Sequence, residues 1–309
     1  MQIRTVTLIG ATGRLGPSIL TALLSHNFKV QILRRSNSTS APPPTHPHLT
    51  ETILPDTFPE AMLETALQNQ DAVICTIPGT ETTLQKRLAL AASKAGVKRF
   101  IPADFGSVDS ESPRAREWVP LYVSKQEVRQ YLQQLSNDNA GFTYTSLVCG
   151  HFFDHDPMWL HIDIAKRRAD VLDEGDVPAS ACTMARIGEA TARILLKAGE
   201  EEGTRNVTLF VQSFCKTQME VVRAFERATG EGFDVKRIDG MAFAEERMGE
   251  MRAGDRAAME DVVWVLGAYE ADWRRKEGFA NGLLGLEEES LDDVCKRIVD
   301  GCNDKKDGC

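Results

Sequence analysis

The chain has 309 residues, of which 42% are hydrophobic and 26% are charged, an ordinary composition for a globular protein. Its formal net charge of −9 disfavours nucleic acid as the main partner, because a phosphate backbone is bound by basic surfaces. No run comes near the roughly 20 apolar residues that a membrane-spanning helix needs, so no membrane association is expected.

Short runs of β-branched residues alternate with helical patterns through the first 150 residues. We predict strands over 5–9, 29–33, 71–77, 99–101 and 142–148, and helices over 18–25, 58–68, 82–95 and 123–135. Residues 36–48 contain four prolines and are predicted as a loop, because neither a helix nor a central strand accommodates them. The alternation implies parallel strands joined by right-handed crossovers, hence an α/β fold with a doubly wound parallel sheet.

The pattern loosens from residue 151 onward. Helices are predicted over 183–196, 219–229 and much of 241–275, and a strand over 206–211. We therefore expect a first domain over 1–150 and a smaller, mainly helical region over 151–309. This prediction allows elements around 181–213 to pack against the sheet of the first domain.

Three glycines lie between the first predicted strand and the first predicted helix, with the spacing G-x-x-G-x-x-G. Gly10 allows a tight turn, Gly13 lets the backbone approach a pyrophosphate, and Gly16 lets helix and strand pack closely. The helix N-terminus adds unpaired N–H groups and a partial positive charge for phosphates. This context predicts a Rossmann domain that binds a dinucleotide; an ordinary glycine turn is the alternative.

The end of the second predicted strand indicates which dinucleotide is bound. Enzymes that use NAD tend to carry Asp or Glu there, for the ribose 2′-hydroxyl. Here the strand ends in Arg34, Arg35 and Ser36, and guanidinium groups suit the 2′-phosphate of NADP(H). Arg34 is the preferred candidate, with Arg35 and Ser36 in support. The alternative is that one arginine is only a solvated charge.

Together with further motifs along the chain, these features resemble the isoflavone-reductase-like and NmrA-like branch of the atypical short-chain dehydrogenases. The glycine turn, Arg34 and Gln85 carry the resemblance first. The segment Ile-Pro-Ala-Asp-Phe-Gly at 101–106 resembles the family's Pro-Ser-Glu-Phe-Gly, and a helix led by Lys125 and the Gly-His-Phe-Phe at 150–153 follow. The match covers residues 4–153 well and continues weakly through 183–229.

Two positions depart from the family pattern. Ala103-Asp104 replaces the family's Ser-Glu, so any hydroxyl role at 103 is lost. Arg186 stands where relatives often carry an Asp before Ile-Gly, which puts predictions about the substrate region in doubt.

The resemblance implies that the domain over 1–150 binds NADP(H) and that the region over 151–309 binds the substrate, and it implies a set of functional residues. Lys125 would be the general acid/base beside the nicotinamide, a role that suits an ammonium facing negative charge on a reduced substrate. The implied cofactor residues are Gly10, Thr12, Gly13, Arg14, Leu15, Gly16, Arg34, Arg35, Ser36, Thr76, Gln85, Ala103, Asp104, Phe105 and Lys125. The substrate pocket would take in Phe105, Tyr122, His151, Phe152 and Phe153.

Tyr122 lies three residues before Lys125, one fewer than in the Tyr-x-x-x-Lys of typical short-chain dehydrogenases. On a helix this turns the tyrosine by about 100°, so we assign it no acid role and favour aromatic packing. His151, His155 and His161 could suggest zinc, but Pro157 breaks the segment and no metal is expected.

The cysteines and the first residues indicate a compartment. Seven cysteines are present, an odd number, and none forms a C-x-x-C pair. The N-terminus runs directly into an apolar strand, without the basic and then apolar stretches of a secretory signal. We therefore expect a reducing, cytoplasmic environment.

The sequence predicts an NADPH-dependent reductase of a small molecule, in secondary metabolism. The substrate would be aromatic or heterocyclic, with a C=O, C=N or activated C=C, and its identity is not readable. Two alternatives stay open, a non-catalytic NADP(H)-sensing regulator and a non-redox cyclase that retains NADP(H). The oligomeric state also stays open, with a homodimer as one option.

Overall fold

The computed structural model describes residues 2–41, 43–199 and 203–304. The chain forms two compact units that interleave along the sequence. The first comprises Met1–Phe105, Leu121–Leu147 and Ala185–Leu209, and the second comprises Gly106–Pro120, Val148–Met184 and Phe210–Cys309. The expectation that residues 1–150 bind the cofactor and residues 151–309 the substrate concerns function and stays a prediction.

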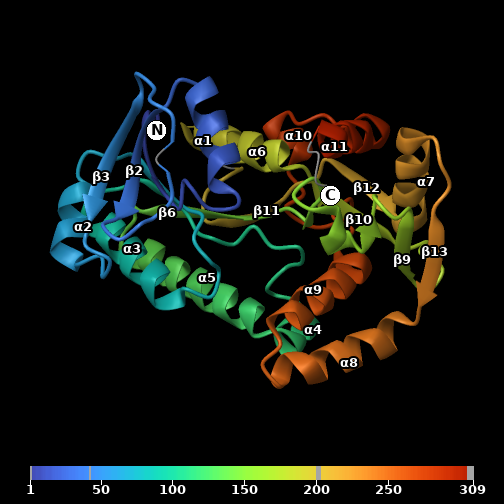
Figure 1. The fold of residues 1–309 in the computed structure, drawn as a ribbon. Coiled ribbons are helices and arrows are strands. Elements are labelled where there is room, and N and C mark those ends of the chain that lie inside the picture. The colour runs from blue at the N-terminus through green and yellow to red at the C-terminus, as the bar shows by residue number, and fades with distance from the viewer. Residues whose placement is uncertain (1, 42, 200–202, 305–309) are drawn as a thin grey trace. The chain divides into compact units, whose positions relative to one another are not determined.

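A seven-stranded sheet in the order β11-β6-β5-β4-β1-β2-β3 forms the centre of the first unit (Figure 1). Its strands are β1 Thr5–Ile9, β2 Lys29–Arg35, β3 Leu49–Leu54, β4 Ala72–Cys75, β5 Arg99–Ile101, β6 Thr143–Val148 and β11 Val207–Phe210. The pairs from β3 through to β6 are all parallel. The predicted doubly wound α/β fold is confirmed.

The strand order places a ligand site at one edge of this sheet. The chain runs outward from β1 to β2 and β3 on one side, and from β4 to β5 and β6 on the other. In such sheets ligands bind beyond the carboxyl ends of the strands, where the winding direction reverses. That point lies past Ile9 and Cys75, which are direct neighbours in the sheet.

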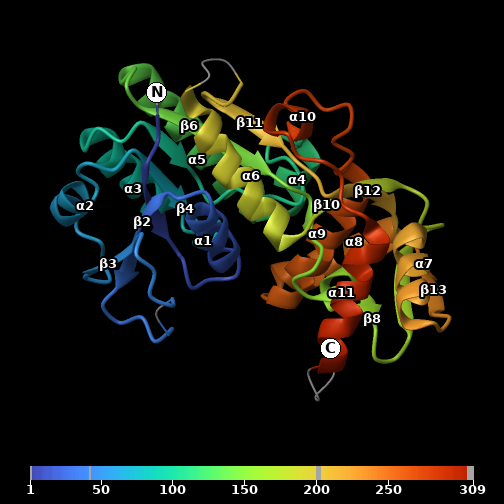
Figure 2. The ribbon, with the colours of Figure 1, turned by 90° about the horizontal axis from the view of Figure 1, so that it is seen from above.

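Helices cover both faces of the sheet (Figures 1 and 2). On one face lie α2 Glu60–Ala66, α3 Thr82–Lys94 and α5 Pro120–Asp138, and on the other lie α1 Gly16–Ser25 and α6 Met184–Leu196, which a short 3-10 turn, Lys197–Gly199, follows. α6 approaches α1 closely at Gly188, where a Cβ atom would overlap the backbone oxygen of Ser18.

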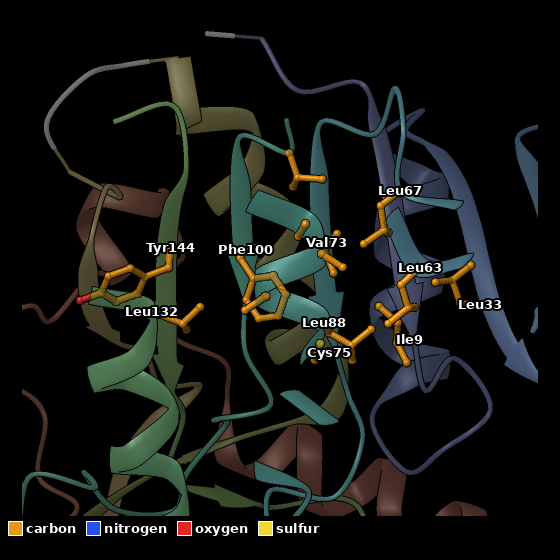
Figure 3. Close-up of a cluster of buried hydrophobic side chains, with 14 of the residues drawn as sticks. Ile9, Leu33, Leu63, Leu67, Val73, Cys75, Leu88, Phe100, Leu132 and Tyr144 are labelled. Atoms are coloured by element: carbon orange, nitrogen blue, oxygen red, sulfur yellow. The ribbon is translucent and has the colours of Figure 1, made fainter. Parts of the chain in front are cut away.

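The core of the first unit lies between the sheet and α2, α3 and α5. Figure 3 shows Val73 of β4 and Phe100 of β5 in one cluster with Leu88 of α3 and Leu132 of α5. All four side chains are fully buried. Ile9 belongs to the same cluster, so core packing also holds the carboxyl end of β1 in place.

The second unit contains two three-stranded sheets, in the orders β12-β10-β7 and β13-β9-β8. Their strands are β7 His151–Phe152, β8 Ile162–Asp163, β9 Arg168–Leu172, β10 Pro178–Cys182, β12 Phe214–Thr217 and β13 Asp234–Ile238. The helices are α4 Pro113–Trp118, α7 Gln218–Thr229, α8 Gly240–Arg252, α9 Arg256–Glu270, α10 Asn281–Leu284 and α11 Leu291–Asp304, with a 3-10 turn over Pro157–Leu160.

The structure confirms several predicted elements and contains others that were not predicted. The helices predicted over 183–196 and 219–229 are α6 and α7, and the region 241–275 divides into α8 and α9. No element was predicted for β3, α4 or the short strands of the second unit. None of the described helices is long and apolar enough to cross a membrane.

Candidate active site

Two glycines of the turn after β1 stand where there is no room for a side chain. Gly10 has a φ of +89°, and a Cβ atom there would lie 2.7 Å from Oγ1 of Thr76. At Gly16 a Cβ atom would overlap the backbone oxygen of Gly10, while Gly13 is exposed and leaves the backbone accessible. The turn therefore presents bare backbone in front of the N-terminus of α1, as a phosphate cradle requires.

Thr76, which directly follows the neighbouring strand β4, stabilises this turn through hydrogen bonds. Its hydroxyl donates to the backbone oxygens of Ile9 and Gly10, each at 2.9 Å. Its backbone N–H donates to the oxygen of Ile9 at 2.8 Å. The side chain predicted to contact the cofactor therefore also holds the cradle in its shape.

A cavity of about 670 Å³ opens in front of the turn, within the first unit. The predicted cofactor residues that line it are Gly10, Thr12, Gly13, Arg34, Arg35 and Thr76. The remaining ones lie outside its lining: Arg14, Leu15, Gly16, Ser36, Gln85, Ala103, Asp104, Phe105 and Lys125. The lining also takes in Ser38, Ser40, Asp56, Phe58 and Arg87, for which the sequence carried no motif.

The two arginines at the end of β2 differ in their surroundings. Arg34 donates to Oε1 of Glu51 at 2.9 Å and to the backbone oxygen of Ser40 at 2.5 Å. Arg35 is exposed, and its guanidinium has no hydrogen bond or ion pair within the described ranges, although its backbone oxygen accepts a hydrogen bond from the N–H of Ser38. Ser36 donates to Asp56 at 3.0 Å. The guanidinium that remains available to a ligand is therefore that of Arg35.

Lys125 lies in the second turn of α5, which begins at Pro120 and so three residues earlier than predicted. Proline suits a first helical turn because its missing N–H would have no helical partner there. The Lys125 side chain is 8% exposed, and its ammonium donates to the backbone oxygen of Asp104. The ring of Tyr122, which is buried, lies 5.6 Å from the Lys125 nitrogen.

The segment that accepts the Lys125 hydrogen bond is itself held by buried side chains. Gln85 of α3 accepts a hydrogen bond from the N–H of Ala103 at 2.9 Å. The Asp104 carboxylate pairs with Arg129 of α5 at 2.5 Å. Phe105, with a φ of +35°, is buried at the end of this turn. The structure thus turns the Asp104 carboxylate toward Arg129.

His151 belongs to the second unit and lies at the start of β7. Burial disfavours the imidazolium and lowers the pKa of His151 from 6.5 to about 4, although a hydrogen bond with the Trp264 backbone opposes this shift. Its Nε2 atom has no hydrogen-bond partner among the residues that the structure describes, and it lies where a side chain at Gly267 would be. The ring is therefore neutral at physiological pH.

Phe152 and Phe153, which are also predicted to contact the substrate, follow His151 in the chain. Phe153 packs edge-on against Phe214, with ring centres 4.8 Å apart, in the core of the second unit. Phe152 is half-buried. An apolar cavity of about 60 Å³ within the second unit is lined by His151, Phe153, Trp264 and their neighbours.

No group of three or more His, Cys, Asp or Glu side chains among the described residues could hold a metal ion. His161 stacks on Trp264 at 3.8 Å and contacts Asp261 at 3.1 Å. The His161 side chain therefore packs against Trp264 and contacts the Asp261 carboxylate.

Comparisons with known proteins give a family and a fold. A model of the NmrA-like family matches residues 2–278. The oxidoreductase aprR of Aspergillus flavus is 34% identical over 303 residues, which cover 96% of this chain and 99% of the relative. The solved structure of AtPrR2 with NADP+ and (+)pinoresinol has a TM-score of 0.76 at 20% identity, covering 96% of this chain and 99% of the other.

A second solved structure has the same fold. The leucoanthocyanidin reductase–NADPH complex from Vitis vinifera gives a TM-score of 0.74 at 17% identity, again over 96% of this chain and 99% of the other. At these identities the likeness to solved structures establishes a shared fold.

Proposed function

This chain belongs to the NmrA-like family, and we propose that it is an NADPH-dependent reductase of a small molecule. The observation that carries the proposal is the buried ammonium of Lys125, which lies in the same unit as the glycine cradle. A sensor needs the dinucleotide site alone, whereas a reductase also needs a proton donor.

The residues around the cavity fit a nicotinamide dinucleotide. A volume of about 670 Å³ falls within the roughly 300–1,000 Å³ of typical ligand sites. A Cβ atom at Gly10 or Gly16 would collide with Thr76 or with the turn itself, so the turn that offers its backbone to phosphates requires glycine at both positions. Arg35 lines the cavity with its guanidinium available, and a guanidinium fork matches a phosphate, which supports NADP(H) over NAD(H).

Bound NADPH would supply a hydride, and residues of the chain would stabilise the resulting charge and donate a proton. Addition of a hydride to a C=O, C=N or activated C=C leaves negative charge on a heteroatom or carbon of the substrate. The Lys125 ammonium would stabilise that charge and donate the proton. The backbone oxygen of Asp104 would hold the ammonium in its orientation.

The substrate in this proposal is an aromatic or heterocyclic molecule of secondary metabolism. The likeness to a structure that holds (+)pinoresinol supports this class. Within the second unit, the apolar lining around Phe153 and Trp264 would suit a ring, and the neutral His151 can exchange a hydrogen bond without adding charge. Phe105, Tyr122 and Phe152 are proposed as further substrate contacts.

The proposal is tested by NADPH oxidation, followed by absorbance, with a panel of pinoresinol, an isoflavone, an aromatic ketone and a cyclic imine. We expect turnover of at least one compound and a loss of about 100-fold or more in Lys125→Ala, with NADPH affinity retained. Lys86→Ala, which removes a half-buried lysine of α3 paired with Glu127, should leave turnover unchanged.

Two results would contradict the proposal. Tight NADPH binding without oxidation by any compound of the panel would favour a sensor or a non-redox enzyme. Full turnover in Lys125→Ala would remove this lysine from the mechanism.

A further inference from the structure

α5 carries two buried cations one turn apart. Lys125 and Arg129 are four residues apart and therefore lie on the same face of the helix. Their side chains are 8% and 5% exposed. Like charges at this spacing repel each other, and burying a charge is costly unless a partner compensates it.

Asp104 contacts both cations, through different groups. Its carboxylate oxygen Oδ2 lies 2.5 Å from Nε of Arg129, and the two side chains are 2% and 5% exposed. Its backbone oxygen accepts the hydrogen bond from the Lys125 ammonium. A single residue therefore neutralises one cation and orients the other.

The backbone around Asp104 is fixed from a second direction. The N–H of Ala103 donates to Gln85, whose side chain is 1% exposed. The stem of Lys125 runs over Gly79, where a Cβ atom would lie 3.1 Å from Cε of the lysine. The location of the ammonium thus depends on how the turn that contains Asp104 is held.

We propose that Arg129 is a positioning residue for Lys125: by binding the Asp104 carboxylate, it fixes the backbone carbonyl that orients the Lys125 ammonium. The inference rests on the proposed role of Lys125 as proton donor. Loss of Arg129 should misplace the ammonium, because the turn that contains Asp104 is no longer fixed. It also removes a like charge one helical turn away and leaves the Asp104 carboxylate without its cation, and both changes favour the charged form of Lys125.

The test measures Lys125 itself, in the protein without added cofactor. Acetic anhydride labels the neutral amine, and mass spectrometry gives the labelled fraction of Lys125 over a range of pH, with Lys86 as the internal standard. In Arg129→Gln we expect the midpoint for Lys125 to move to higher pH by roughly half a unit or more, because a neighbouring positive charge is lost and the Asp104 carboxylate is left unpaired. Turnover should fall about 10-fold or more, because a misplaced donor is inefficient, while NADPH affinity is retained.

Matched variants separate positioning from general stability. Asp71→Asn breaks another partly buried ion pair of the first unit, with Lys98 at 2.7 Å, and should lower stability without moving the Lys125 midpoint. Arg129→Lys keeps the charge and should restore part of the wild-type profile. If Arg129→Gln does not fold, Asp104→Asn combined with Arg129→Gln removes both charges of that pair and takes its place, with the fall in turnover as its readout.

The outcomes distinguish this inference from the proposed function. An unchanged Lys125 midpoint and unchanged turnover in a folded Arg129→Gln protein would overturn the positioning role, even if Lys125→Ala is inactive. Full turnover in Lys125→Ala would instead remove the proposed function on which the inference rests.

Discussion

At the scale of single residues, the two arginines at the end of β2 should contribute differently to cofactor choice. Arg35 lines the cavity and is exposed, whereas Arg34 is engaged by Glu51 and the backbone of Ser40. We predict that Arg35→Ala weakens NADPH binding about 10-fold or more and leaves NADH binding unchanged, because a charge-assisted hydrogen bond contributes about 1.5–3 kcal/mol. Calorimetric titration with both cofactors measures this.

Arg34→Ala is the matched control for that prediction. It should weaken NADPH binding less than Arg35→Ala, because the Arg34 guanidinium already has protein partners. A larger loss in Arg34→Ala would show that its guanidinium leaves Glu51 to bind the phosphate, and would reverse the assignment.

Local spacing in the sequence predicts roles for some residues, and these roles stay predictions. The glycine turn is identified from three positions within seven residues, and Lys125 from a short family motif. The pair of Asp104 and Arg129 could not be predicted, because 25 positions separate its members and only the folded chain brings them together. The pairing of Arg34 with Glu51 could not be predicted for the same reason, because 17 positions separate the two residues.

At the scale of elements, the contact between α1 and α6 depends on the absence of a side chain at Gly188. We predict that Gly188→Ala lowers the free energy of unfolding by about 1–3 kcal/mol, because the added methyl group would collide with the backbone of Ser18. Urea denaturation measures the change.

Gly249→Ala in α8 is the control for this prediction, since a Cβ atom there would meet nothing within 4 Å. Alanine is favoured over glycine in a helix, so stability should rise by up to about 1 kcal/mol. Equal effects of the two substitutions would contradict the proposed close contact between α1 and α6.

The elements that could be predicted are those with long, apolar or strongly periodic patterns. β1 and β4 consist mainly of apolar and β-branched residues, β2 has an apolar centre, and every residue of β6 is buried, which is typical of buried parallel strands. β3 is an edge strand with mostly exposed or half-buried side chains, and β7 and β8 contain two residues each. Such segments carry too little pattern to be recognised, because their pairing is decided by distant neighbours.

At the scale of the whole molecule, the burial of His151 couples stability to pH. Its pKa is about 4 in the folded protein and 6.5 as an ordinary histidine, so below pH 6.5 the unfolded chain binds a proton that the folded chain does not. The free energy of unfolding should therefore fall as the pH drops from 6.5 toward 4. The loss contributed by this group would reach about 3 kcal/mol at most.

Urea denaturation at a series of pH values, compared between wild type and His151→Gln, measures that coupling. The variant should lose less stability over this interval than the wild type, and His46→Gln, which changes an exposed histidine, should follow the wild type. Identical pH dependence in His151→Gln and wild type would show that His151 is not the responsible group.

The central claim is that the cavity in front of the glycine turn binds NADPH, and a calorimetric titration of the purified protein tests it most directly. The account predicts saturable binding with one NADPH per chain, tighter than the binding of NADH, and its loss when Gly16 is replaced by leucine, whose side chain would collide with the backbone of Gly10 and distort the cradle. Absence of saturable NADPH binding to the folded wild-type protein would contradict the account.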